Sequence, residues 1–119
     1  MIASPFPVLR LKPKANARAI RHGAPWVYDN ELVLDRRSKS LVPGTIAVLE
    51  DAERRPMGLV AANPLSRITA RMIERDVSVA IDQSWFERKI TRALELRTRL
   101  FDQPYYRLIH AEADGLPGL

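Results

Sequence analysis

Basic residues near the amino terminus have the types and spacing that point most directly to chemistry. No acidic residue precedes Asp29, and the stretch before it contains the basic residues Arg10, Lys12, Lys14, Arg18 and Arg21. Clustered ammonium and guanidinium groups bind the phosphates of nucleic acids, and an arginine can also stack on a base. A phosphate-binding surface is therefore predicted at Lys12, Lys14, Arg18 and Arg21. A solvated cationic face without a ligand is the alternative, and charge alone favours neither.

Two aromatic residues, Trp26 and Tyr28, lie two positions apart in a short predicted strand and so share one of its faces. With basic neighbours they could stack on the bases of single-stranded RNA. Packing in the core is favoured instead, because large aromatic side chains usually fill a small barrel. Arg67 and Arg71, on the polar face of a later strand, are weaker binding candidates. A further basic cluster in a predicted loop could bind a phosphate or stay solvated, and the solvated state is favoured: Arg36, Arg37 and Lys39.

Enzyme signatures are absent from the sequence. It contains no glycine-rich phosphate loop, no nucleophile elbow, and no cluster of metal-ligand residues at the usual spacing. The absence of cysteine excludes disulfides, thiolate metal sites and cysteine nucleophiles. His22 and His110 lie far apart, and Glu112 and Asp114 are expected to brace a turn rather than to act as an acid and base. We predict no catalytic residue and no metal site in this chain.

The length and charge fit one small basic domain. The chain has 119 residues, with 19 Lys and Arg against 14 Asp and Glu, which gives a net charge of +5. This excess favours an anionic partner. The amino terminus lacks the basic and apolar regions of a signal peptide, and no segment approaches the roughly 20 apolar residues of a membrane span. A soluble, cytoplasmic protein without a membrane partner is expected.

The pattern of apolar residues predicts six short strands and one short helix before residue 78. The strands are expected at residues 8–12, 26–28, 32–34, 45–49, 57–62 and 67–72, and the helix at 16–22, ended by Gly23. The polar run 35–40 is predicted to be a loop. In the last strand Ile68, Ala70 and Met72 are expected inside, with Thr69 outside between Arg67 and Arg71 on a basic outer face. Short strands at this density predict a small twisted barrel.

A longer helix is predicted after the strands. Residues 84–87, Ser-Trp-Phe-Glu, have the spacing of a capping box, and residues 102–104 end the helix. Its apolar face is expected to consist of Phe86, Ile90, Ala93, Leu94 and Phe101. Residues 105–109 are predicted to form another strand, followed by a turn.

Residues 21–32, RHGAPWVYDNEL, resemble the signature of the PUA-like domain that opens bacterial large-subunit rRNA cytosine-C5 methyltransferases. Two further regions agree in order and spacing: residues 43–64, and residues 106–119, which end in EADGLPGL. The resemblance spans residues 9–119, which is only the front of the family's architecture. Ala24 and Ala111 stand where the family has His and Gly, so no role of that His is transferred to this chain.

The resemblance implies an α+β fold that is mostly β. It places a small PUA-like mixed pseudo-barrel at 1–78, a linker helix at 79–104, and the first strand and turn of a truncated central α+β domain at 105–119. In this fold the first helix and the adjoining strand face RNA. Both grounds point to Lys12, Lys14, Arg18 and Arg21 as RNA-binding residues. The full set expected to bind RNA also includes Gly23, Trp26, Arg67 and Arg71.

The resemblance also implies a function: an RNA-binding module that positions rRNA for a SAM-dependent methyltransferase whose catalytic domain is absent from this chain. S-adenosylmethionine would then be the cofactor of the parent protein, and no cofactor is expected here. The expected partners are rRNA and the parent's own catalytic domain, and a homodimer stays an open alternative. The rival hypothesis is a protein or interdomain docking module without direct RNA contact, using the helix near residues 84–101.

Overall fold

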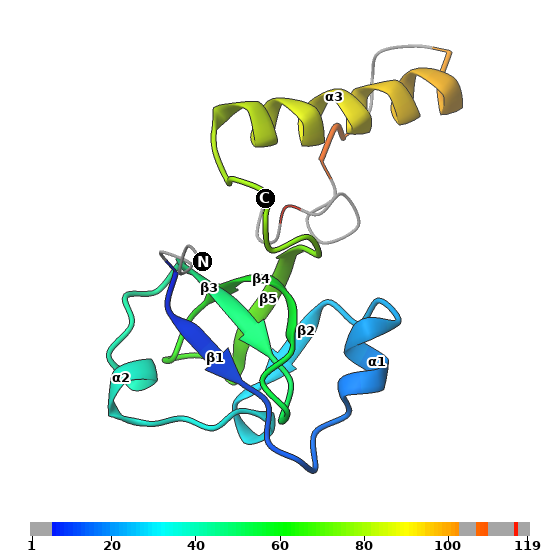
Figure 1. Cartoon of the computed structure of the whole chain (residues 1–119). Helices are drawn as coiled ribbons and strands as arrows, with labels where there is room; N and C mark the ends of the chain where they lie inside the picture. The colour runs from blue at the N-terminus through cyan, green and yellow to red at the C-terminus, as the bar shows by residue number, and fades with distance from the viewer. Residues whose placement is uncertain (1–5, 103–106, 110–115, 117–119) are drawn as a thin grey trace. The chain divides into compact units, whose positions relative to one another are not determined.

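The computed structural model describes residues 6–102, 107–109 and 116, and the structural statements below refer to these (Figure 1). Two compact units divide the chain, Met1–Val77 and Ser78–Leu119. The first unit contains a sheet and short helices, and the second contains one long helix. Together they make a mostly-sheet α+β fold, as predicted.

A five-stranded sheet forms the first unit. Its strands are β1 (Val8–Arg10), β2 (Trp26–Tyr28), β3 (Thr45–Glu50), β4 (Pro56–Ala62) and β5 (Ile68–Glu74), and their order in the sheet is β1-β3-β4-β5-β2. The β1–β3 pair is parallel, whereas β3–β4, β4–β5 and β5–β2 are antiparallel. The short helices are α1 (Ala17–Arg21), the 3-10 helix η1 (Asp29–Glu31) and α2 (Arg36–Lys39).

The sheet curls until the chain after β2 meets the end of β1. Leu11 and Leu32 form an isolated antiparallel bridge, and the Lys12 backbone N–H donates to the Glu31 carbonyl at 2.8 Å. The largest fully buried side chains include Leu9, Leu11, Leu32, Leu49 and Leu59, and most of these form one apolar core inside the curl. The predicted small pseudo-barrel is therefore confirmed.

Two expectations for residues 32–40 were wrong. Residues 32–34 are not a strand, since only Leu32 pairs, so five of the six predicted strands are present among the described residues. The predicted loop at 35–40 contains α2, because Asp35 and Ser38 cap its first turn reciprocally. The Ser38 N–H donates to Asp35 Oδ1 and the Asp35 N–H donates to Ser38 Oγ, both at 2.8 Å. This exchange satisfies backbone donors that a polar loop would leave to water.

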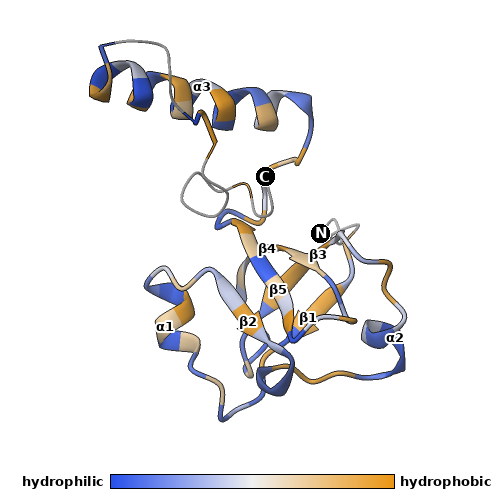
Figure 2. Ribbon diagram, turned by 180° about the vertical axis from the view of Figure 1, so that it is seen from behind, coloured by the Kyte–Doolittle hydropathy of each residue, from blue (hydrophilic) through white to orange (hydrophobic). Residues whose placement is uncertain are grey.

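The second unit contains the predicted long helix, α3 (Gln83–Leu100), with a different start. Asp82, not Ser84, is the N-cap, and its Oδ1 accepts from the Trp85 N–H at 2.9 Å. Ala93 is buried as expected, whereas Phe86, Ile90, Leu94 and Phe101 are exposed. Figure 2 shows apolar and polar residues alternating along this helix. No helix among the described residues is long and apolar enough to cross a membrane.

The predicted strand at 105–109 is not present where the structure describes it, because residues 107–109 have no strand pairing. Tyr105 and Tyr106 lie outside the described residues, as do His110, Glu112 and Asp114. The predicted turn at 112–119 also falls outside them, apart from Leu116, which is buried.

The hairpin between β3 and β4 contains a backbone conformation that favours glycine. Arg54 has a φ of 65°, in the left-handed region. Its N–H donates to the Asp51 carbonyl at 3.0 Å, and the Asp51 N–H donates to the Arg55 carbonyl at 3.0 Å. The turn therefore needs a left-handed residue at position 54, and a β-carbon is disfavoured there.

We expect Arg54→Gly to stabilise the first unit by up to roughly 1 kcal/mol, because glycine adopts this φ without steric cost. Thermal unfolding followed by circular dichroism would measure the change as a higher Tm. Glu53→Gly is the matched control in the same turn and should lower Tm, since position 53 does not have a positive φ. Equal losses in the two variants would show that position 54 carries no such cost.

Candidate nucleic-acid interface

Helix α1 carries part of the predicted basic surface and depends on its surroundings for stability. It has only five residues, which is too short to be stable in isolation. Asn16 caps its start, with Oδ1 accepting from the Ala19 N–H at 3.0 Å. Gly23, with a φ of 117°, follows the helix, and its N–H donates to the Ile20 carbonyl at 3.2 Å. The predicted helix end at Gly23 is confirmed.

Three tertiary contacts hold α1 against the sheet. The Ile20 side chain is buried in the core. The Arg75 guanidinium donates to the Ile20 carbonyl, and the Arg21 guanidinium forms an ion pair with Asp51. Arg21 therefore already has an anionic partner within the protein, and in this it differs from Lys12, Lys14 and Arg18 as far as the structure describes them.

Asp51 is a buried carboxylate that four donors surround. Its Oδ1 accepts from the backbone N–H groups of Glu53 and Arg55, at 3.0 and 2.9 Å. Its Oδ2 accepts from Arg55 Nε at 3.0 Å and from the Arg21 guanidinium. Burial raises the pKa of the Asp51 carboxyl, but the Arg55 backbone N–H and the two guanidinium groups outweigh burial and hold that pKa below its ordinary value. Asp51 is therefore ionised at neutral pH.

The remaining basic residues of the amino-terminal region face solvent. Lys12 and Lys14 lie in the connection from β1 to α1, and Arg18 lies on α1. All three are exposed, and within the described part of the chain their side chains form no hydrogen bond or ion pair. Their charges are available to an anionic ligand in a way that the charge of Arg21 is not.

An exposed aromatic pair lies on β2, next along the chain from α1. Trp26 is 38% exposed and Tyr28 is 44% exposed, whereas Val27 between them is fully buried. The expectation that these aromatic side chains pack in the core was wrong. The alternation of the strand allows one face inside, and the core takes Val27. Trp26 and Tyr28 therefore share the outer face of β2.

Arginines of β5 and the turn before it lie beside these aromatic rings. Arg71 pairs with Trp26 across the two strands, and its guanidinium carbon lies 5.7 Å from the centroid of the Trp26 ring, which is cation–π distance. Arg67 is exposed, and its carbonyl accepts from the Asp29 N–H at 2.8 Å. A surface depression is lined by Tyr28, Asp29, Asn30 and Arg67.

The basic outer face expected for β5 is interrupted. Thr69, predicted to face outward between Arg67 and Arg71, is only 1% exposed, and its hydroxyl donates to the Ser66 carbonyl at 2.9 Å. Arg67 itself precedes the strand. The two arginines therefore do not form a continuous basic stripe along β5. Each lies beside an aromatic residue of β2 instead, Arg71 beside Trp26 and Arg67 beside Tyr28.

Sequence reasoning missed the Asp51 anchor, whose local signal is an aspartate at the start of a tight turn. It also did not predict that Arg10 and Arg37 line one pocket between β1 and α2, apart from this surface. Asp51 and Arg21 are thirty positions apart, so the pairing itself has no local signal.

Comparison with known proteins gives one family match and several similar proteins. The model of the PUA-like domain matches residues 9–75. A ribosomal RNA large subunit methyltransferase of Deinococcus radiodurans is 33% identical over 98% of this chain and 30% of its own length. Ribosomal RNA large subunit methyltransferase I of Alteromonas mediterranea is 34% identical over 86% of this chain and 26% of its own length. The chain thus spans less than a third of the length of either relative.

A solved structure shares the fold. It is that of a Streptococcus mutans protein assigned as a SAM-dependent methyltransferase, with a TM-score of 0.73 and 12% sequence identity. The match covers 95% of this chain and 29% of the other.

The ionised Asp51 predicts how stability depends on pH. Because the pKa of Asp51 is lowered by folding, its contribution should be complete well above the ordinary value of 3.8 and be lost as the pH falls through the lowered pKa. We expect Asp51→Asn to lower Tm by several degrees at pH 7, and the difference from the wild type to shrink below about pH 4. Thermal unfolding from pH 2 to 7 would measure this.

Asp29→Asn is the control, since Asp29 is an exposed carboxylate of the same unit and its substitution makes the same chemical change. It should leave the pH profile unchanged. Hydrogen exchange at the Gly23 and Ala24 amides, which bond to α1 carbonyls, should accelerate in Asp51→Asn only. An Asp51→Asn protein with wild-type Tm and exchange would contradict the assigned role of Asp51.

Proposed function

Since the chain belongs to the PUA-like domain family and its relatives are ribosomal RNA large subunit methyltransferases, we propose that it is an RNA-binding module. It positions rRNA for a methyl transfer whose catalytic residues lie outside this chain. S-adenosylmethionine would serve that transfer. The described residues offer no glycine-rich loop at a strand end to hold such a cofactor, so we assign its binding to the rest of the parent polypeptide.

The observation that carries this proposal is the outward-facing Trp26 with Arg71 beside it. An apolar ring exposed on a strand, with a guanidinium at cation–π distance, presents a flat surface with a positive rim. Nucleobases stack on such rings with about 1–3 kcal/mol per base, and every base has a face that can do so. Tyr28 on the same side of β2 offers a second ring, and Arg67 lies next to it.

The basic residues before β2 supply the phosphate contacts. Lys12, Lys14 and Arg18 are exposed and have no anionic partner among the described residues, so they can bind phosphates at little cost in lost ion pairs. Arg21 is not one of these phosphate contacts. Its ion pair with Asp51 orients α1 and so positions Arg18. Gly23 gives the chain the positive φ that it needs to pass from α1 toward β2.

A docking module is the second candidate. Helix α3 presents exposed apolar side chains, Phe86, Ile90 and Leu94, which recur at the spacing of one helix face. Such a face suits contact with another protein surface, whether the parent's catalytic domain or a second copy of the chain. Binding through it would be insensitive to salt, whereas binding to RNA phosphates weakens as salt rises.

We expect the triple variant Lys12→Ala, Lys14→Ala, Arg18→Ala to weaken binding to a labelled rRNA fragment and to lower its salt dependence. Each lost phosphate contact reduces the slope of log K against log salt by about 0.7–0.9, so three contacts reduce it by about 2. Fluorescence anisotropy across a series of salt concentrations would measure both.

The matched control removes the same charge from α3: Arg88→Ala, Arg92→Ala and Arg99→Ala. All three arginines are exposed, so fold and net charge are equally affected. The control should leave the slope unchanged. Equal effects in both triple variants would show that only total charge matters, and no salt-sensitive binding in the wild type would favour the docking module.

If RNA bases stack on Trp26, removal of its ring should weaken RNA binding independently of the basic residues. Trp26→Ala should weaken binding to a single-stranded oligoribonucleotide by about tenfold or more, which is the effect of losing one stacked base. Trp26→Phe keeps a ring and should retain most of the affinity. Trp26 is only 38% exposed, so Trp26→Ala should also lower Tm, and Trp26→Phe should lower it less. Binding is therefore compared at a temperature at which both variants are folded. Full affinity in Trp26→Ala would exclude Trp26 from the interface.

A further inference from the structure

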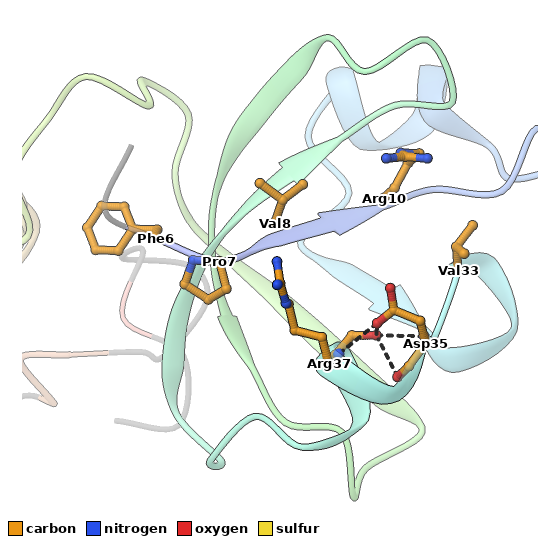
Figure 3. Close-up of a pocket in the computed structure, with 8 residues that line it drawn as sticks. Phe6, Pro7, Val8, Arg10, Val33, Asp35 and Arg37 are labelled. Atoms are coloured by element: carbon orange, nitrogen blue, oxygen red, sulfur yellow. Dashed lines mark hydrogen bonds between the residues drawn. The ribbon is translucent and has the colours of Figure 1, made fainter. Parts of the chain in front are cut away.

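A pocket of about 290 Å³ lies between the outer face of β1 and the segment that leads into α2 (Figure 3). Its apolar wall is formed by Phe6, Pro7, Val8 and Val33, and its polar lining by Arg10, Asp35, Arg37 and Ser38. In both overall views α1 and α2 lie at opposite sides of the first unit, so this pocket is separate from the surface at α1 and β2.

The pocket walls are firmly held in place. Leu9 of β1 is buried in the core, so its neighbours Val8 and Arg10 both face outward toward the pocket. The opposite wall is tied to β1 by the Val33 N–H, which donates to the Arg10 carbonyl at 2.9 Å. Reciprocal capping between Asp35 and Ser38 fixes the first turn of α2, which lines the pocket. Such a cavity is formed before any ligand arrives.

Two guanidinium groups give the pocket donors for which the described residues provide no hydrogen-bond partner: Arg10 through its Nε, and Arg37. Arg10 Nε is buried and has no hydrogen-bond partner in the described structure, which is unfavourable for a charged donor. Arg37 is exposed, and Figure 3 shows its side chain directed toward β1. Guanidinium groups bind phosphate oxygens through several parallel hydrogen bonds. The pair therefore suits a phosphate better than a neutral ligand.

Asp35 adds an acceptor beside these donors. Its Oδ1 accepts from the N–H and the hydroxyl of Ser38, at 2.8 and 2.9 Å, and because Asp35 is exposed its carboxylate can accept from a further donor. These contacts, first that of the Ser38 N–H, lower the pKa of the Asp35 carboxyl, so it is ionised at neutral pH. An inorganic phosphate would gain nothing from a carboxylate, but the hydroxyl of a ribose would donate to it.

We propose that this pocket binds one ribonucleotide. Arg10 and Arg37 hold its phosphate, Asp35 Oδ2 accepts from a ribose hydroxyl, and the base packs on the apolar wall of Val8 and Val33. The ligand is either a nucleotide of an RNA chain or a free mononucleotide, since both carry the same three groups. None of these residues belongs to the proposed RNA surface at α1 and β2, so either site can fail to bind while the other binds.

The test measures binding to the triple variant Lys12→Ala, Lys14→Ala, Arg18→Ala, so that the other surface contributes little. The probes are uridine and adenosine 5′-monophosphates, their deoxy counterparts, inorganic phosphate and a uridylate tetranucleotide. Amide chemical-shift changes in NMR spectra report both the affinity and the residues touched. We expect shifts at β1 and α2, and weaker binding of the deoxy and inorganic probes.

Substitutions then separate the pocket from general charge. Arg37→Ala should weaken ribonucleotide binding by about tenfold, the effect of losing a charge-assisted contact. Arg36→Ala is the matched control, because Arg36 is exposed on the same helix and does not line the pocket. Asp35→Asn keeps an N-cap residue and should reduce the preference for ribose over deoxyribose. The dispersion of the same NMR spectra verifies that each variant is folded.

Binding of the tetranucleotide alone would identify an RNA chain as the source, and binding of mononucleotides would identify a free nucleotide; both support the pocket. The proposal is overturned if no probe binds at β1 and α2, if Arg36→Ala and Arg37→Ala act alike, or if deoxy and inorganic probes bind as tightly as the ribonucleotides.

Discussion

The carboxylate of Asp51 joins parts of the first unit that the sheet alone does not hold together. It accepts from the backbone of the β3–β4 hairpin and from the guanidinium groups of Arg55 and Arg21, so the turn and α1 share one buried charge. A buried carboxylate is stable in ionised form only when such donors surround it. Because α1 is too short to form alone, this contact and the buried Ile20 decide where Arg18 and the residues before it are presented.

A second constraint comes from the narrow core. The curled sheet closes where Leu11 meets Leu32, and the space inside is filled mainly by leucine, valine and alanine. In a three-residue strand such as β2, either the middle residue or the two outer ones face inward, and in this narrow core it is Val27. Trp26 is thereby left on the surface beside Arg71. The aromatic surface is a consequence of how the core is filled, and not of a dedicated loop.

The sequence predicted those parts of the fold whose signals are local. The apolar and β-branched runs at 45–49 and 57–62 are strands, and Gly23 ends α1, because alternation and a positive φ are properties of short segments. Helix α2 was missed because its reciprocal cap lies in a wholly polar run. The start of α3 was misplaced by two residues, since Asp82 and Ser84 are both good capping residues. Trp26 was expected inside because large aromatic side chains usually fill a small barrel, and the sequence does not show which face of β2 points inward. The Arg21–Asp51 pair was missed because it has no local sequence pattern.

The position of β2 at the end of the strand order has one more consequence. An edge strand exposes backbone groups that another chain can extend, which leads to unwanted strand addition and aggregation. Here the edge is only three residues long, Pro25 precedes it without an N–H to offer, and the register shifts between Val27 and Tyr28. These features discourage a foreign strand from adding to the sheet. The edge of β2 can therefore remain open to solvent without extending the sheet into a second molecule.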